Sequence, residues 1–200
     1  MSQVFIGGSR RLSRLNAVIR GRLDNIIERH HSVLIGDANG GDRAVQAYLA
    51  ERGYGSVTVY CTNAHCRNNV GQWPVRSVAA TDQRGFDYYA LKDAAMATDA
   101  ECGFMLWDGQ SKGTLFNIRR LLAAGKPVVV YLAADHACHT IRREADLAAL
   151  GLPPMAVTRQ QHAGGDPEGQ EPLFPSDWGA QANTRLQPTR RQTRRRAAES

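Results

Sequence analysis

Long hydrophobic runs are missing from this sequence of 200 residues. No apolar stretch approaches the roughly 20 residues of a membrane-spanning helix. The N-terminal residues, MSQVFIGGSRR, also lack the extended apolar segment of a signal peptide. We therefore expect a cytoplasmic protein that makes no contact with a membrane.

Cysteine is also scarce. The four residues Cys61, Cys66, Cys102 and Cys138 include no CxxC pair. In a reducing compartment, thiols at or near strands are most simply packing residues. The sequence therefore predicts neither a disulfide nor a zinc site.

Several motifs that define common enzyme classes are absent as well. Neither GxGxxG nor GxxxxGK[ST] occurs, so nothing indicates an ordinary dinucleotide enzyme or a P-loop ATPase, and we expect no cofactor. His136 and His139 are three residues apart, a spacing that would put them on one face if the segment were helical, but they lack a third ligand nearby in the sequence, so no metal is expected. Ser9 has no His and Asp partners nearby in the sequence and is better interpreted as a hydrogen-bond donor to a phosphate than as a nucleophile.

Positive charge is concentrated at the C-terminus. The net charge is +6, and residues 1–158 carry 18 Lys/Arg against 14 Asp/Glu, a balance of +4. Residues 159–200 are rich in Gly, Pro, Gln and Arg, which predicts a flexible tail after a single domain spanning 1–158. The arginines between Arg185 and Arg196 could contact nucleic acid or could form a solvated, disordered segment.

The hydrophobic pattern alternates between strands and helices. Strands are expected at 3–6, 33–36, 56–61, 102–107 and 128–132, and helices at 15–27, 42–53, 86–98, 115–122 and 141–150. This order predicts an α/β fold, a three-layer Rossmann-like open parallel sheet of about five strands with helices on both faces. Residues 62–84 show no sustained period and are expected to form a long loop.

Three polar, glycine-rich turns follow strands of this predicted sheet. Because the carboxyl ends of parallel strands lie at one edge, these turns should converge there and offer amides and cationic side chains to an anion such as phosphate. The predicted ligand-binding residues are Gly7, Gly8, Ser9, Arg10 and Arg11 in the first turn; Gly36, Asp37, Gly40, Gly41, Asp42 and Arg43 in the second; and Trp107, Asp108, Gly109, Ser111, Lys112, Gly113 and Thr114 at the third.

The long loop adds a further group of candidates. Arg67, Asn68 and Asn69 precede Trp73, and together such residues could grip a phosphate, a base edge and a base face. Alternatively, the loop is a surface lid whose Trp73 packs on the core.

The three motifs together carry a family resemblance. VFIGGSRR, LIGDANGGDRAVQAYLA, and KDAAMATDAECGFMLWDGQSKGTLFNI followed by GKPVVVY resemble the SLOG superfamily over residues 3 to about 133. This Rossmann-like group includes cytokinin-activating phosphoribohydrolases, DprA-type DNA-binding proteins and predicted nucleotide sensors, and nucleoside deoxyribosyltransferases are similar in fold. The resemblance implies a nucleotide or nucleotide-derived ligand, bound at Gly7, Gly8, Ser9 and Arg10, at Gly40, Gly41 and Asp42, and at Gly113 and Thr114.

One departure from the enzymatic members bears on activity. The hydrolases of this group carry a PGGxGT turn followed by catalytic glutamates, whereas here GT is followed by Leu115, Phe116 and Asn117. An amide cannot act as a general base or nucleophile as a carboxylate does. Catalysis would need a pair of carboxylates to meet across the crevice, and the candidates are Asp37, Asp42, Asp93 and Asp108. Asp42 as a helix cap, Asp93 as an ion-pair partner and Asp108 as a ribose ligand are the non-catalytic alternatives.

Three functional hypotheses follow. The first is a sensor or carrier that binds a nucleotide-like small molecule. The second is an N-glycosidase or deoxyribosyltransferase-like enzyme acting on nucleosides or nucleotides, and the third is a nucleic-acid-binding protein. The sequence does not define the oligomeric state, and a homodimer is among the states it allows.

Overall fold

A computed structural model describes residues 1–63, 66–80 and 85–150. Its centre is a sheet of seven strands in the order β4-β3-β2-β1-β5-β6-β7. The strands are β1 (Gln3–Gly8), β2 (Ser32–Gly36), β3 (Val57–Thr62), β4 (Val75–Val78), β5 (Cys102–Trp107), β6 (Val128–Leu132) and β7 (Ala137–Ile141). All neighbouring strands are parallel except β7, which pairs antiparallel with β6.

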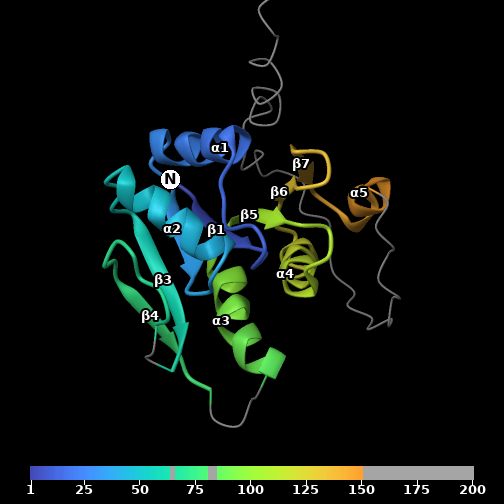
Figure 1. Cartoon of the computed structure of the whole chain (residues 1–200). Helices are drawn as coiled ribbons and strands as arrows, with labels where there is room; N and C mark the ends of the chain where they lie inside the picture. Colours follow the sequence, from blue (N-terminus) through green and yellow to red (C-terminus); the bar gives the residue numbers. More distant parts are fainter. Residues whose placement is uncertain (64–65, 81–84, 151–200) are drawn as a thin grey trace, which may run out of the picture.

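The helices cover both faces of the sheet, as the sequence predicts (Figure 1). They are α1 (Ala17–Glu28), α2 (Gly41–Glu51), α3 (Gly85–Asp99), α4 (Lys112–Ala123) and α5 (Glu144–Ala149). Apolar side chains of α1 and α2 pack in one buried cluster, and those of α3, α4 and α5 pack in a second cluster on the opposite face. The α/β class and its three layers are confirmed.

Two strands were not expected. β4 lies inside the segment predicted to be a loop, and it is short and largely exposed at the sheet edge, so it has little of the hydrophobic pattern on which the prediction relied. β7 ends at Ile141, where the helix expected at 141–150 should begin, and that helix is shortened to α5. The suggestion that His136 and His139 share a helix face is therefore wrong, because His139 belongs to β7 and His136 has a positive φ of 56° just before it.

The prediction about the cysteines is also wrong for two of the four. Cys61, near the end of β3, forms a disulfide with Cys66, and their Cα atoms are 5.2 Å apart, within the usual range for a bridge. The absence of a CxxC pair says nothing of whether two thiols five residues apart meet in space, which is why the prediction failed. Cys102 and Cys138 are free.

The sheet reverses its winding between β1 and β5. From β1 the chain proceeds outward through β2, β3 and β4, and it then returns to place β5 and β6 on the other side of β1. In open α/β sheets this switch point leaves a crevice beyond the carboxyl ends of the two central strands. No helix within the described residues is long and apolar enough to span a membrane. The expected tail, 159–200, lies outside the described residues.

The start of α2 approaches the end of β1 so closely that both positions require glycine. A Cβ added at Gly41 would lie 2.8 Å from the Cα of Gly8 and 3.0 Å from its carbonyl carbon. The amide of Gly41 donates to the carbonyl of Ser9 at 3.2 Å, which anchors the approach. The first two turns are therefore packed backbone against backbone.

This packing predicts opposite effects for two glycine-to-alanine substitutions. Gly41→Ala should lower the free energy of unfolding by about 1–3 kcal/mol, because overpacked sites force the backbone to move. Gly21→Ala lies within α1, where a Cβ meets nothing within 4 Å, and should raise it by up to about 1 kcal/mol. Urea denaturation of both variants measures these changes. Equal stability of Gly41→Ala and wild type would contradict the close approach.

Candidate functional site

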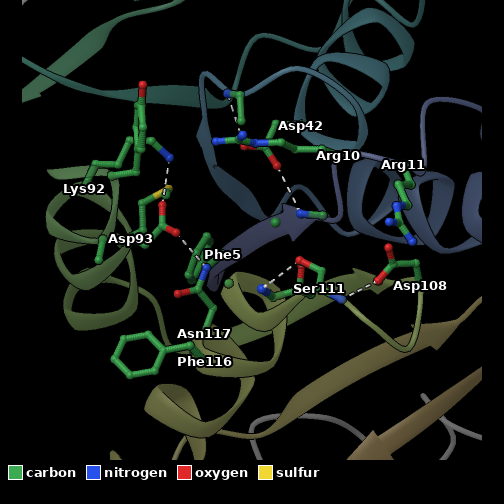
Figure 2. Close-up of a pocket in the computed structure, with 18 of the residues that line it drawn as sticks. Phe5, Arg10, Arg11, Asp42, Lys92, Asp93, Asp108, Ser111, Phe116 and Asn117 are labelled. Carbon is green, nitrogen blue, oxygen red and sulfur yellow. Dashed lines mark hydrogen bonds and ion pairs between the residues drawn. The ribbon is translucent and has the colours of Figure 1, made fainter. Parts of the chain in front are cut away.

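A cleft of about 640 Å³ lies at the switch point, beyond the carboxyl ends of β1 and β5. Side chains from α3 and α4 form much of its wall (Figure 2). The predicted residues that line it are Gly7, Gly8, Arg10, Arg11, Asp42, Arg67, Asp93, Asp108, Ser111, Gly113 and Thr114. The three turns do converge at one edge of the sheet.

The remaining predicted residues lie outside the lining of the cleft. They are Ser9, Gly36, Asp37, Gly40, Gly41, Arg43, Asn68, Asn69, Trp107, Gly109 and Lys112. Several of them build the turns instead. Ser9, for example, is buried and donates its hydroxyl to Asp108 Oδ1 at 3.1 Å. Whether the lining residues contact a ligand remains a prediction.

Carboxylates satisfy many of the turn amides that the sequence suggested would be open to an anion. Asp42 Oδ1 accepts from the Gly8 amide at 3.0 Å, and Asp42 Oδ2 accepts from the Ala38 amide at 3.4 Å. In the third turn, Asp108 Oδ1 accepts from the amides of Gln110 and Ser111 at 3.0 and 2.7 Å. Burial would raise the pKa of Asp108, but the hydrogen bonds from these two amides and from the Ser9 hydroxyl outweigh burial, and the pKa is lowered. The turns are therefore held by their own aspartates.

The N-terminus of α4 is the part of the third turn that faces the cleft. Ser111 is the N-cap and accepts from the Thr114 amide, while Gly113 lines the cleft. Helix geometry leaves the first amides of a helix without an intrahelical acceptor, and they carry a partial positive charge. Arg10 and Arg11 border the same cleft. An anion placed here would meet both the helix start and two guanidinium groups.

Asp37 is occupied by a neighbouring arginine. The Arg67 guanidinium donates to both carboxylate oxygens, at 3.1 and 2.7 Å, and the Arg67 amide adds a third bond at 3.1 Å. Burial raises the pKa of Asp37, but these bonds and the Lys92 charge outweigh it, and the net shift is downward. Asp37 thus positions Arg67 at the wall of the cleft.

Only Arg67 of the long-loop candidates reaches the cleft among the described residues. Asn68 donates to the Asp37 carbonyl at 2.8 Å, and Asn69 donates to the Trp73 carbonyl at 2.8 Å. Trp73 is 8% exposed within the core, and its indole nitrogen donates to the Tyr54 carbonyl at 2.9 Å. The structure therefore favours the reading in which Trp73 packs on the core.

Helix α3 contributes cleft residues that the sequence prediction missed. The residues missed altogether are Phe5, Ala38, Tyr89, Ala90, Lys92, Met96, Gln110, Phe116 and Asn117. Tyr89, Lys92 and Met96 follow one another at three- and four-residue spacing, so they share one face of α3. The sequence did contain a signal for this face of α3, namely a lysine on the same side as a methionine. A lysine buried there needs carboxylate partners, and these would lie near the cleft.

Lys92 is the most buried charge in the cleft, at 3% exposure. Its ammonium donates to Asp93 Oδ1 at 2.7 Å and lies 3.9 Å from Asp37 Oδ1. Burial opposes its charge, yet Asp93, Asp42 and Asp37 outweigh burial and raise its pKa. A Cβ at Gly36 would lie 2.7 Å from both Lys92 Nζ and Asp42 Oδ2, so glycine leaves the space in which these groups converge.

Asp42 is a buried carboxylate with an altered proton affinity. Burial raises its pKa to about 6, and nearby Asp93 also raises it. Lys92 and the hydrogen bonds from the Gly8 and Ala38 amides act in the opposite direction. Its expected role as a helix cap is wrong, because the N-cap of α2 is Gly40. Asp42 instead ties the end of β1 to the turn after β2.

Aromatic side chains form an exposed part of the wall. Tyr89 is 38% exposed and Phe116 is 41% exposed. The Arg67 and Arg10 guanidinium carbons lie 4.7 and 5.7 Å from the centre of the Tyr89 ring.

Among the described residues, no group of three His, Cys, Asp or Glu side chains could hold a metal ion.

Comparison with known proteins identifies a shared fold. No protein-family model matches the sequence, and no curated protein matches it. A solved structure of DNA processing protein A from Helicobacter pylori, studied for its binding of single-stranded DNA, matches with a TM-score of 0.50 and 13% sequence identity. The match covers 64% of this chain and 64% of that one. Likeness at this level shows a common Rossmann-like fold.

The buried Asp42 predicts a distinctive pH dependence of stability. Its pKa of about 6 exceeds the ordinary 3.8, so between these values the native state holds a proton that the unfolded chain releases. Its contribution to the free energy of unfolding therefore falls as pH rises through this window. The stability of Asp42→Asn relative to wild type should rise across the same window by up to about 3 kcal/mol.

Denaturant unfolding of wild type and variants from pH 2 to pH 7 measures this difference and also covers the acid range in which Asp37 titrates. Asp37→Asn provides a control of opposite sign. The lowered pKa of Asp37 means that its stabilisation is present above the ordinary value and is lost as pH falls through the native one. A difference between wild type and Asp42→Asn that does not change with pH would contradict the assignment.

Proposed function

We propose that the cleft binds a nucleotide or a nucleotide-derived molecule, and that the protein acts as a sensor or carrier of it. The observation that carries this proposal is the presence, in one cleft, of a helix N-terminus with two arginines and of an exposed aromatic wall. The first group comprises Gly113 of α4, the N-cap Ser111, Arg10 and Arg11. Tyr89 and Phe116 belong to the second.

The first group suits a phosphate. Amides at a helix start and guanidinium groups are the donors that proteins most often direct at phosphate oxygens. Asp108 limits where a phosphate could bind, because its carboxylate already accepts hydrogen bonds from the amides of Gln110 and Ser111. A phosphate would therefore lie toward Gly113 and the two arginines rather than deeper in the turn.

The second group suits a base. A flat ring gains contact area against Tyr89 or Phe116, and the arginines beside Tyr89 favour stacking further. The second turn of α4 offers Asn117 where an enzymatic glutamate would be expected from the SLOG resemblance. Binding without turnover agrees with this exchange, and we include membership of that superfamily in the proposal.

Titration calorimetry with mono-, di- and cyclic nucleotides tests the proposal. At least one should bind to wild type, and Arg10→Ala should weaken it about tenfold to a hundredfold, since a charge-assisted contact contributes about 1.5–3 kcal/mol. Arg43→Ala is the matched control, because Arg43 is an exposed arginine outside the cleft. If no nucleotide binds, or if both variants bind as wild type does, the proposal is wrong.

A second candidate is an N-glycosidase or a deoxyribosyltransferase-like enzyme. The observation in its favour is that Asp42 and Asp93 both line the cleft and both interact with Lys92. The raised pKa of Asp42, about 6, is a property of carboxyl groups that act as general acids. Chromatography of incubated nucleosides and nucleotides for free base, with Asp42→Asn as comparison, decides between turnover and binding.

A third candidate is binding of single-stranded nucleic acid. The Helicobacter pylori protein of similar fold binds single-stranded DNA, and exposed Tyr89 and Phe116 beside arginines are the kind of surface on which unpaired bases stack. The arginines at 185–196 lie outside the described residues. Oligonucleotide titration at several salt concentrations separates this candidate from the first, because phosphate contacts weaken steeply with salt.

A further inference from the structure

Three polar side chains form a cluster on the wall of the cleft, across from Arg11 and Asp108 in the view of Figure 2. Lys92 donates to Asp93 Oδ1 at 2.7 Å, and Asn117 Nδ2 donates to Asp93 Oδ2 at 2.9 Å. Lys92 and Asn117 are only 3% and 6% exposed. Two buried donors on α3 and α4 therefore hold the Asp93 carboxylate in one orientation.

The cluster presents acceptors to the cleft. An ionised carboxylate has about four lone-pair directions on its two oxygens, and Lys92 and Asn117 take one at each oxygen. The remaining lone pairs of Asp93 can accept from a ligand. A phosphate would be repelled here, so a ligand group that fits beside Asp93 carries an O–H or an N–H.

The distance between the proposed phosphate position at Gly113 and Asp93 indicates whether the donor is a sugar hydroxyl or an N–H of the base. Gly113 and Asn117 are four residues apart on α4, which corresponds to a rise of about 6 Å. Sugar hydroxyls lie about one such step from the 5′-phosphate of a nucleotide, whereas the polar edge of the base lies farther away. The hydroxyls of the sugar therefore fit the acceptors, and the base extends toward the aromatic wall.

We propose, building on the proposed function, that the ligand is a ribonucleotide and that Asp93 accepts hydrogen bonds from its ribose hydroxyls. Asn117 and Lys92 act as positioning residues for this carboxylate. The site then distinguishes ribose from 2′-deoxyribose, because a missing hydroxyl leaves a lone pair of Asp93 without the ligand's donor and screened by the ligand from water.

Calorimetry of wild type with the 5′-monophosphates of adenosine, guanosine, cytidine and uridine, and with their 2′-deoxy counterparts, tests this inference. For any base that binds, the 2′-deoxy form should bind at least about tenfold more weakly. Equal affinity in the two series overturns the ribose assignment and leaves the proposed function intact. Absence of binding in both series and in the wider nucleotide panel overturns the proposed function itself.

A matched pair of variants assigns the discrimination to Asp93. Asp93 and Asp99 lie on the same helix, each has a side chain 22% exposed, and each pairs with one cation, Lys92 at 2.7 Å or Arg76 at 2.6 Å. Asp93→Asn should weaken the ribonucleotide and leave the deoxyribonucleotide unchanged, while Asp99→Asn should keep the wild-type ratio. A wild-type ratio in Asp93→Asn overturns the assignment. Should Asp93→Asn not fold, the comparison of ribonucleotides with 2′-deoxyribonucleotides on wild type still decides whether the site discriminates ribose. A preference for guanine nucleotides with equal affinity for the ribose and 2′-deoxyribose forms overturns the inference.

Discussion

A lysine ammonium lies almost out of water between α3 and the turn after β2, and the surrounding carboxylates keep it charged. Lys92 interacts with Asp37, Asp42 and Asp93, which come from the turn after β2, from α2 and from α3. Removing one partner from a buried ion pair leaves the other charge uncompensated, at a cost of about 3–5 kcal/mol. The cluster therefore couples the packing of these elements to the wall of the cleft, because Asp42 and Asp93 belong to both.

The aspartates of the turns also determine where an anion can bind. Asp42 holds the amides of Gly8 and Ala38, and Asp108 holds those of Gln110 and Ser111. These hydrogen bonds satisfy the turn amides within the protein, and they also place negative charge next to the helix starts. Under the proposed function, a phosphate would lie at the first turn of α4 beside Arg10 and Arg11, and hydroxyl or N–H groups of the ligand would lie near the carboxylates.

An aromatic and an arginine side chain lie at the rim of the cleft. Arg67 is positioned by Asp37 and lies against Tyr89, and the disulfide between Cys61 and Cys66 closes the chain directly before Arg67. The segment is further held by Gln46, whose side chain donates to the Asn68 carbonyl at 3.3 Å and accepts from the Val70 amide at 3.0 Å. Hydrogen bonds with Asp37 and Gln46 thus hold the segment from Arg67 to Val70 at the rim of the cleft, and a preformed rim is favourable for binding because little order must be gained.

The sequence by itself determined the α/β class, the central strands and the convergence of three turns. Hydrophobic runs such as those of β2 and β5 are buried on both faces, and parallel strands necessarily bring their following turns to one edge. It did not determine edge strand β4, whose pattern is mostly exposed, or the bridge between Cys61 and Cys66, which depends on the distance between the two residues in space. Only the tertiary structure decided the roles of the aspartates. Asp37, Asp42, Asp93 and Asp108 are alike as letters, and they differ because burial, Arg67, Lys92 and the turn amides surround each of them differently.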